Sequence, residues 1–264
     1  MWQLVLFLVL AAVAGPWLWR KYRTRQRRPA IARFASQHGL LDSGDRYVDS
    51  PGYDFPLLRE PTRGRNGYHN VLAGQWQGLP VKGADYWYST STNTSADLSV
   101  GDGRNSHYFS IVVTDLAATV PYVSVQPKDV LTRAFDHVGL PPLPHLGPES
   151  LDVIDFEPEE FNQKFEVTTA DGEFAIKLID AAMIQWLVSA GGGLTFEVGG
   201  CNLLVSCGQL PVTSLVQLFD AAKGFVDHIP HVVWAEYGDQ GANSHDGGPP
   251  GTDGTNGPPQ HPRP

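Results

Sequence analysis

Residues 70–90 read NVLAGQWQGLPVKGADYWYST, and this stretch indicates which class of fold the chain adopts. Two runs rich in apolar and aromatic residues, 70–76 and 79–90, flank the Gln-Gly dipeptide at 77–78. A two-residue connection that ends in glycine is typical of a tight β-hairpin, because glycine adopts positive φ without steric cost. Three consecutive aromatic residues at 86–88 suit a pleated sheet. The sequence therefore predicts an antiparallel pair of strands here.

Further strands and helices are predicted on both sides of this hairpin from hydrophobic periodicity and turn residues. The other predicted strands cover 108–116, 122–126, 151–156 and 165–169, followed by a second hairpin of 194–198 and 202–207 over Gly199-Gly200. The predicted helices cover 29–40, 129–138, a segment opening at Glu157, the region 171–188, and 213–229. Residues 42–67 are predicted to be irregular loop, and 231–237 a short extended segment. Together they predict an α+β fold, a mostly antiparallel sheet with packed helices.

Several side chains are predicted to fix the helices in the second half of the chain. Pro158 is expected at the first helical position, and Asp171 and Asp180 are expected as N-caps. Phe161 and Phe165, one turn apart, are expected to pack on the core. The inward-facing residues of the following helices are predicted to be Leu178, Ile179, Ala182, Met183, Trp186 and Leu187.

An apolar run at the N-terminus predicts a transmembrane helix. Residues 2–19 read WQLVLFLVLAAVAGPWLW and carry no charge. A helix of that length spans roughly 27 Å, close to the hydrocarbon thickness of a bilayer. The competing interpretation is a cleaved secretory signal, since Ala12-Val13-Ala14 resembles a cleavage site. A signal peptide, however, carries its positive charge before the apolar run.

The charge distribution predicts which way this anchor faces. Six cations follow the run within nine residues, and no Asp or Glu lies in residues 1–28; the cations are Arg20, Lys21, Arg23, Arg25, Arg27 and Arg28. Positive flanks stay in the cytoplasm, so we expect the N-terminus outside and the body inside. Anionic lipid near Arg20–Arg28 is a further expected partner, at about 1 kcal/mol per cation.

The remaining chain is acidic and ends in a tail without hydrophobic pattern. Residues 29–264 hold 13 Lys+Arg against 28 Asp+Glu, which excludes the basic surface that nucleic acid needs. The predicted organisation is a basic-flanked anchor over 1–28, a juxtamembrane helix and loop over 29–67, and an α+β cytoplasmic domain over 68–237. A proline-rich connector at 140–148 marks a subdivision of that domain. Residues 238–264 hold 7 Gly and 6 Pro and predict a disordered tail.

Neither a metal site nor a cofactor site is predicted. Cys201 and Cys207 have the same parity on a strand, so they are expected to be reduced and to share its buried face. The acids at 152–160 lack the spacing of a calcium loop and are expected to be helix-terminal acids, although a hard-cation site for them was the competing reading. The chain carries no Gly-x-Ser-x-Gly, His-Glu-x-x-His or Cys-x-x-Cys motif.

One run of the second half resembles a known group of proteins. Residues 155–167 read DFEPEEFNQKFEV, followed by MIQWL at 183–187, and NVLAGQWQG at 70–78 adds to the likeness. These segments resemble uncharacterised, mainly actinobacterial, membrane-anchored proteins that are grouped as a domain of unknown function. The resemblance covers about residues 68–236 and implies an N-terminal anchor and an α+β cytoplasmic body. It implies no activity, cofactor or site residue.

Two function hypotheses follow from these features. The first is a single-pass membrane protein that presents an acidic α+β domain to the cytoplasm for interaction with an unknown protein partner. The alternative is a membrane-tethered enzyme, a carboxylate-dependent hydrolase, with Asp85, Asp152 and Asp155 as candidate catalytic residues. Asp152, Asp155 and Glu157 have no assigned role in the first hypothesis beyond helix capping. Convergence of the candidate acids in one pocket would favour the enzyme.

Overall fold

The computed structural model describes residues 27–44, 53, 55–58, 66–91, 104–128 and 151–238. The strands are β1 (Leu41–Gly44), β2 (Asn66–Trp76), β3 (Leu79–Ser91), β4 (Arg104–Pro127), β5 (Asp152–Ile154), β6 (Phe165–Thr169) and β7 (Thr195–Gly208). The helices are residues 27–38, α3 (Glu159–Lys164), α4 (Gly172–Leu178), α5 (Ala181–Ala190), α6 (Leu215–Asp227) and α7 (His231–Tyr237), with a 3-10 turn at Val212–Ser214. The α+β class is confirmed.

The seven strands form one sheet around β4. The strand order is β1-β2-β3-β4-β6-β5, and β7 pairs with β4 off this path. All six strand pairings are antiparallel. Residues 109–113 pair with both β3 and β7, and residues 123–125 pair with both β6 and β7. Strand β7 therefore follows one edge of β4, while β3 and β6 occupy the other edge in turn.

The hairpin of β2 and β3 is confirmed at the predicted turn. Gln77 has φ 49° and Gly78 has φ 83°, the double positive φ of a type I′ connection. Strand β2 begins at Asn66, earlier than predicted, and β1 lies in the stretch that was expected to be loop. Residues 55–58 of that stretch also pack on the sheet through Phe55 and Leu58.

Two predicted breaks in the strands are wrong, for related reasons. Strand β4 is continuous because Leu116, Ala118 and Val120 keep alternating inward across the expected gap. Strand β7 is also continuous: its two halves both pair with β4 rather than with each other, and Gly200, at φ 57°, faces Val120 at an irregularity in the register. The register of β4 against β7 shifts on both sides of this pair, and the predicted hairpin over Gly199-Gly200 does not form.

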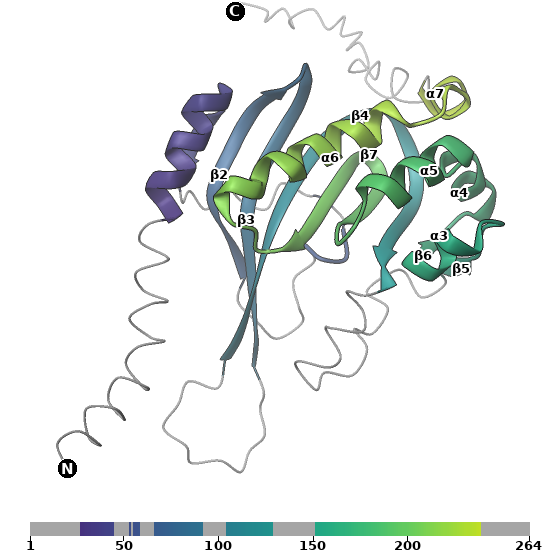
Figure 1. Cartoon of the computed structure of the whole chain (residues 1–264), viewed down its shortest axis with the longest axis horizontal. Coiled ribbons are helices and arrows are strands. Elements are labelled where there is room, and N and C mark those ends of the chain that lie inside the picture. The colour runs from purple at the N-terminus through teal and green to yellow at the C-terminus, as the bar shows by residue number, and fades with distance from the viewer. Residues whose placement is uncertain are drawn as a thin grey trace, which may run out of the picture.

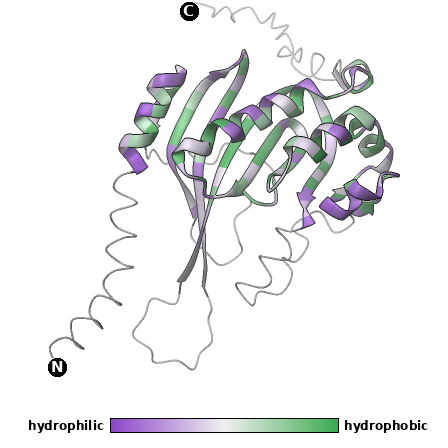
Figure 2. Cartoon of the chain, in the orientation of Figure 1, coloured by the Kyte–Doolittle hydropathy of each residue, from purple (hydrophilic) through white to green (hydrophobic). Residues whose placement is uncertain are grey.

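The sheet carries a hydrophobic cluster on each face. Helices α4, α5, α6 and the helix at 27–38 pack on one face, and α6 lies across it in Figure 1. In Figure 2 the strands behind α6 are largely hydrophobic, whereas α6 itself alternates between hydrophilic and hydrophobic residues. The smaller cluster on the opposite face contains Tyr86, Ile111, Val113 and Leu204, with Phe55 and Leu58 against them.

Most predicted helix signals are confirmed, and two are corrected. Asp171 accepts hydrogen bonds from the backbone of Glu173 and Phe174, and Asp180 accepts one from Met183. Phe161 and Phe165 are buried as expected. Pro158 is the N-cap of α3 instead of its first residue, and Ala182 is exposed because it lies on the outer side of α5. Trp186 is half-buried and packs against the core.

The segment at 231–237 is the helix α7, not the predicted extended strand. Pro230 is its N-cap, and the helical spacing brings Val233, Trp234 and Tyr237 onto the main cluster. The adjacent valines 232 and 233 favour strand locally, but packing of one helical face outweighs that preference.

Some predictions fall outside the described residues. The anchor over 2–19, the helix over 129–138, the connector at 140–148 and the tail after 238 belong to this group. Strands from before and after 140–148 nevertheless join a single sheet. Among the described residues, no helix is long and apolar enough to cross a membrane.

Candidate functional site

The most elaborate polar cluster of the described residues surrounds Asp85 on β3. Strand alternation points Asp85 towards the helix-covered face, between the buried Val81 and Gly83 on one side and Trp87 on the other. The Arg27 guanidinium donates from Nε to Asp85 Oδ2 at 2.7 Å and from Nη2 to Oδ1 at 2.6 Å. The side chains of Arg27 and Asp85 are 13% and 5% exposed, so this two-pronged ion pair is almost withdrawn from water.

Three neighbours complete the hydrogen bonding of this ion pair. Asn70 Nδ2 donates to Asp85 Oδ2 at 2.8 Å, and Ser110 Oγ donates to Oδ1 at 3.3 Å. The third nitrogen of the Arg27 guanidinium donates to the carbonyl of Leu210 at 2.5 Å. Each Asp85 oxygen thus receives at least two hydrogen bonds, the condition under which a buried ion pair is tolerated.

The position of Asn70 depends on an irregularity in β2. The register of β2 against β3 shifts between His69 and Leu72, and Asn70 adopts φ 54° within that shift. Asparagine tolerates this left-handed conformation better than most residues. Its side-chain oxygen also accepts from Arg28 Nη1 at 3.4 Å, and the same nitrogen donates to Asp42 at 2.9 Å. The two arginines therefore bind the helix at 27–38 to β1, β2 and β3.

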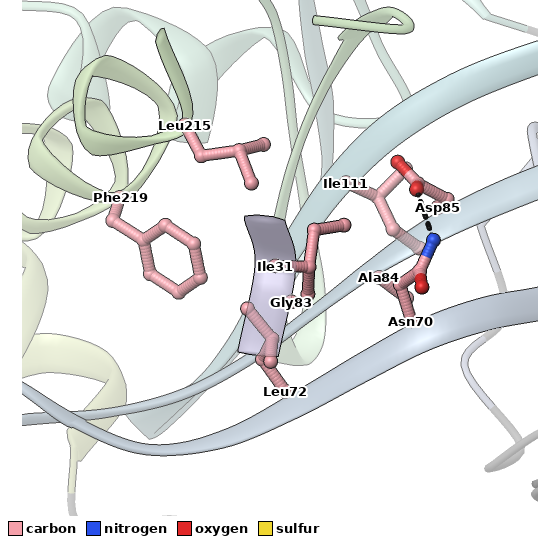
Figure 3. Close-up of a pocket in the computed structure, with 9 residues that line it drawn as sticks. All are labelled: Ile31, Asn70, Leu72, Gly83, Ala84, Asp85, Ile111, Leu215 and Phe219. Carbon is pink, nitrogen blue, oxygen red and sulfur yellow. Dashed lines mark hydrogen bonds between the residues drawn. The ribbon is translucent and has the colours of Figure 1, made fainter. Parts of the chain in front are cut away.

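A small cavity of about 10 Å³ adjoins this cluster. It lies between the carboxylate end of the cluster and the apolar side chains of Ile31, Leu215 and Phe219 (Figure 3). A Cβ on Gly83 would lie 2.6 Å from Phe219 Cζ, so the α6 aromatic ring is seated directly on β3. That volume suffices for about one water molecule, so no substrate fits here.

The three candidate catalytic carboxylates do not converge. Asp85 is buried on β3, whereas Asp152 lies on β5, at the far edge of the strand order, and Asp155 follows that strand; both are exposed. Glu157 is exposed as well. The condition that would favour the hydrolase hypothesis is therefore not met in the described residues.

The remaining acids and the cysteines have ordinary environments. Glu159 and Glu160 lie in the first turn of α3, and Glu160 pairs with Lys164 at 2.8 Å. Cys207 is half-buried, and burial raises the pKa of its thiol to about 12. The prediction that Cys201 shares the same buried face is wrong: Cys201 is exposed, because it lies at the irregularity of β7. The described residues contain no group of three or more His, Cys, Asp or Glu side chains placed to hold a metal ion.

Sequence reasoning identified Asp85 but missed its partners. The sequence around Arg27 indicates only a basic flank, yet Arg27 binds Asp85 across 58 positions of sequence. Asn70 and Ser110 carry no motif. The only available signal was the acidic residue at an inward position of β3, flanked by apolar residues, which requires a buried cation or donor.

Comparisons with known proteins show a likeness of fold. No protein-family model and no curated protein matches the sequence. The crystal structure of the mycobacterial trehalose monomycolate transport factor A, TtfA, matches over 78% of this chain and 95% of that chain, with a TM-score of 0.50 and 14% sequence identity. At that identity the likeness concerns the arrangement of helices and strands alone.

Proposed function

We propose that this chain is a single-pass membrane protein whose α+β domain serves as a non-enzymatic accessory factor in the cytoplasm. Residues 2–19 form the anchor in this proposal, and residues 20–28 its cytoplasmic flank. The observation that carries it is the buried ion pair of Arg27 with Asp85. The last part of the basic flank is thereby an integral part of the folded domain, and the domain is held close to the anchor.

The acidic character of the domain favours a partner with a basic surface. Residues 29–264 carry a net charge of −15. Cytoplasmic loops of integral membrane proteins are rich in Lys and Arg, so they offer the complementary charge at the same membrane face. We therefore infer that the partner is an integral membrane protein with basic cytoplasmic loops.

One resemblance supports the accessory role, and another supports the anchored arrangement. The solved structure of similar fold is described as a transport factor. The membrane-anchored actinobacterial proteins that the sequence resembles imply the same arrangement of anchor and body. We extend the accessory role and the anchored arrangement to this chain as part of the proposal.

The experiment is recovery of the full-length chain from its own membranes after chemical cross-linking. We expect the chain in the membrane fraction, cross-linked to one integral membrane protein. The yield of this cross-linked complex should fall when cross-linking is carried out at higher salt concentration, because exposed charges are then screened. A reporter that is active only in the cytoplasm should work when fused to the C-terminus. A soluble full-length chain, an active exterior reporter, or absence of a membrane-protein partner at low salt would contradict the proposal.

A further inference from the structure

The N-terminal end of the helix at 27–38 and the far end of the β3–β4 hairpin lie on the same side of the molecule. Both point towards the bottom of the view in Figure 1. The ion pair explains this arrangement, since Arg27 is bound to Asp85 and Trp87 is only two residues further along β3. Two residues of strand correspond to about 7 Å. The chain therefore enters the domain near Trp87, about four residues of strand before the last described pair of the hairpin, Ser91 with Arg104.

Aromatic and imidazole side chains of β2, β3 and β4 gather near this entry point, before the last three residue pairs of the hairpin. We call this region the aromatic end (His69, Trp87, Tyr88, His107 and Tyr108). Trp87 pairs in register with Tyr108, and Tyr88 pairs with His107. The ring centroids of His69 and Trp87 are 6.1 Å apart, and those of Tyr88 and His107 are 4.9 Å apart. Tyr108 is 42% exposed, one of the few large hydrophobic side chains that the described surface presents to this extent.

The two strand segments of the aromatic end carry no acidic residue. Residues 86–91 and 104–109 contain no Asp or Glu, although residues 29–264 carry a net charge of −15. Burial lowers the pKa of His107 and raises the pKa of Tyr88, so both side chains are neutral near pH 7. An anionic membrane surface would repel most of this acidic domain but not these two strand segments.

The length of the preceding chain limits how far this end lies from the bilayer. Seven residues, 20–26, separate the apolar run from Arg27. The eight residue steps from the end of the run to Arg27 reach only about 26–29 Å when fully extended, and about 12 Å as a helix. Tryptophan and tyrosine prefer the headgroup region, where the ring meets apolar surface and the polar atom meets water.

We propose that the aromatic end docks on the lipid headgroup region of the membrane that holds the anchor. This inference rests on the proposed anchor and adds to it an orientation. The α4–α7 corner, at the opposite side of the molecule in Figure 1, then faces away from the bilayer and is free for the protein partner.

The test measures the depth of single positions in the full-length chain reconstituted into vesicles. An environment-sensitive fluorophore is attached to Tyr108→Cys in a Cys201→Ser background, and quenching by a lipid with a nitroxide headgroup is recorded. Cys207 remains, because it is half-buried and its thiol pKa of about 12 keeps it unreactive. Two control variants carry the label elsewhere. Leu41, 68% exposed, lies in β1 just after the helix at 27–38, and Val232, 49% exposed, lies on α7.

We expect quenching at position 108 to exceed that at positions 41 and 232 by at least about threefold, because only the first lies in the headgroup region. Equal quenching at all three positions, in protein that still floats with the vesicles, would overturn the docking and leave the anchor intact. Stronger quenching at position 232 would overturn the orientation. Protein that does not float with the vesicles would refute the anchor, and with it both this inference and the proposed function.

Discussion

Asp85 and Asp155 are the same residue type in opposite environments, and the contrast shows what each acidic region does. Asp85 is buried, receives hydrogen bonds from three side chains and holds an arginine of the N-terminal helix. Asp155 lies exposed in the acidic stretch that leads into α3. The buried Asp85 is balanced by the arginine that it binds, whereas the exposed acids stay hydrated and need no partner. A carboxylate in this chain is therefore informative only when its surroundings are known.

The largest expected difference between the two regions is in stability. Asp85→Asn removes the charge that compensates Arg27, and breaking a buried ion pair costs about 3–5 kcal/mol. Asp155→Asn, the matched control on the exposed stretch, should change the free energy of unfolding by less than about 0.5 kcal/mol. Urea unfolding of the full-length chain in detergent, followed by tryptophan fluorescence, measures both. Equal effects would remove the distinction between the regions.

Within the acidic region itself, an aromatic residue should matter far more than the acids beside it. Phe161 is fully buried between Phe156 and Phe165, with ring centroids 5.5 and 5.3 Å away. Phe161→Ala should cost about 3–5 kcal/mol, the usual loss for a buried aromatic side chain. Glu159→Ala, in the same helix, should cost only about 0.3–1 kcal/mol through the helix dipole. If Phe161→Ala left stability unchanged, its inward position would be wrong.

Substitution of the two capping aspartates should reduce stability by an amount between these extremes. Asp171 accepts from two backbone amides of α4, and Asp180 accepts from one amide of α5 at 2.9 Å. Substitution of either by alanine should cost about 1 kcal/mol, because the freed amides then depend on water. The same unfolding assay measures the loss, and Asp155→Ala serves as the uncapped comparison. Losses above about 3 kcal/mol would indicate a role beyond capping.

The smallest expected effect is a difference in thiol reactivity between the two cysteines. Cys201 is exposed, while burial raises the pKa of Cys207 to about 12. At pH 7.5 a maleimide should modify Cys201 alone, and Cys207 only after unfolding, since the thiolate is the reactive form. Mass spectrometry of the native and the unfolded protein counts the modified thiols. Two rapid modifications in the native protein would show that β7 is open at Cys207.

Local signals predicted much of the fold. The turn at Gln77-Gly78, the caps at Asp171 and Asp180, and the paired Phe161 and Phe165 all depend on residues within one turn of each other. Such contacts are readable from sequence because spacing alone brings the partners together.

Failures arose where a distant partner decides the local structure. Gly199-Gly200 forms a turn signal in isolation, but β4 pairs with the residues on both sides of it, so β7 continues as one strand. Residues 231–237 are helical because one face packs on the main cluster. The same limit hid the candidate site, since no pattern at Asp85 indicates that its cation is 58 positions earlier.

The central claim is that Arg27 and Asp85 act as one structural unit that joins the helix at 27–38 to the sheet. A double-mutant cycle tests this claim most directly. Unfolding free energies are measured for Arg27→Met, Asp85→Asn and the double variant of the full-length chain. We predict that each single change costs about 3–5 kcal/mol and that the double variant loses at least about 2 kcal/mol less than the sum, since neither charge is then left unpaired. Strictly additive losses would show that the two side chains do not stabilise one another, and would contradict the account.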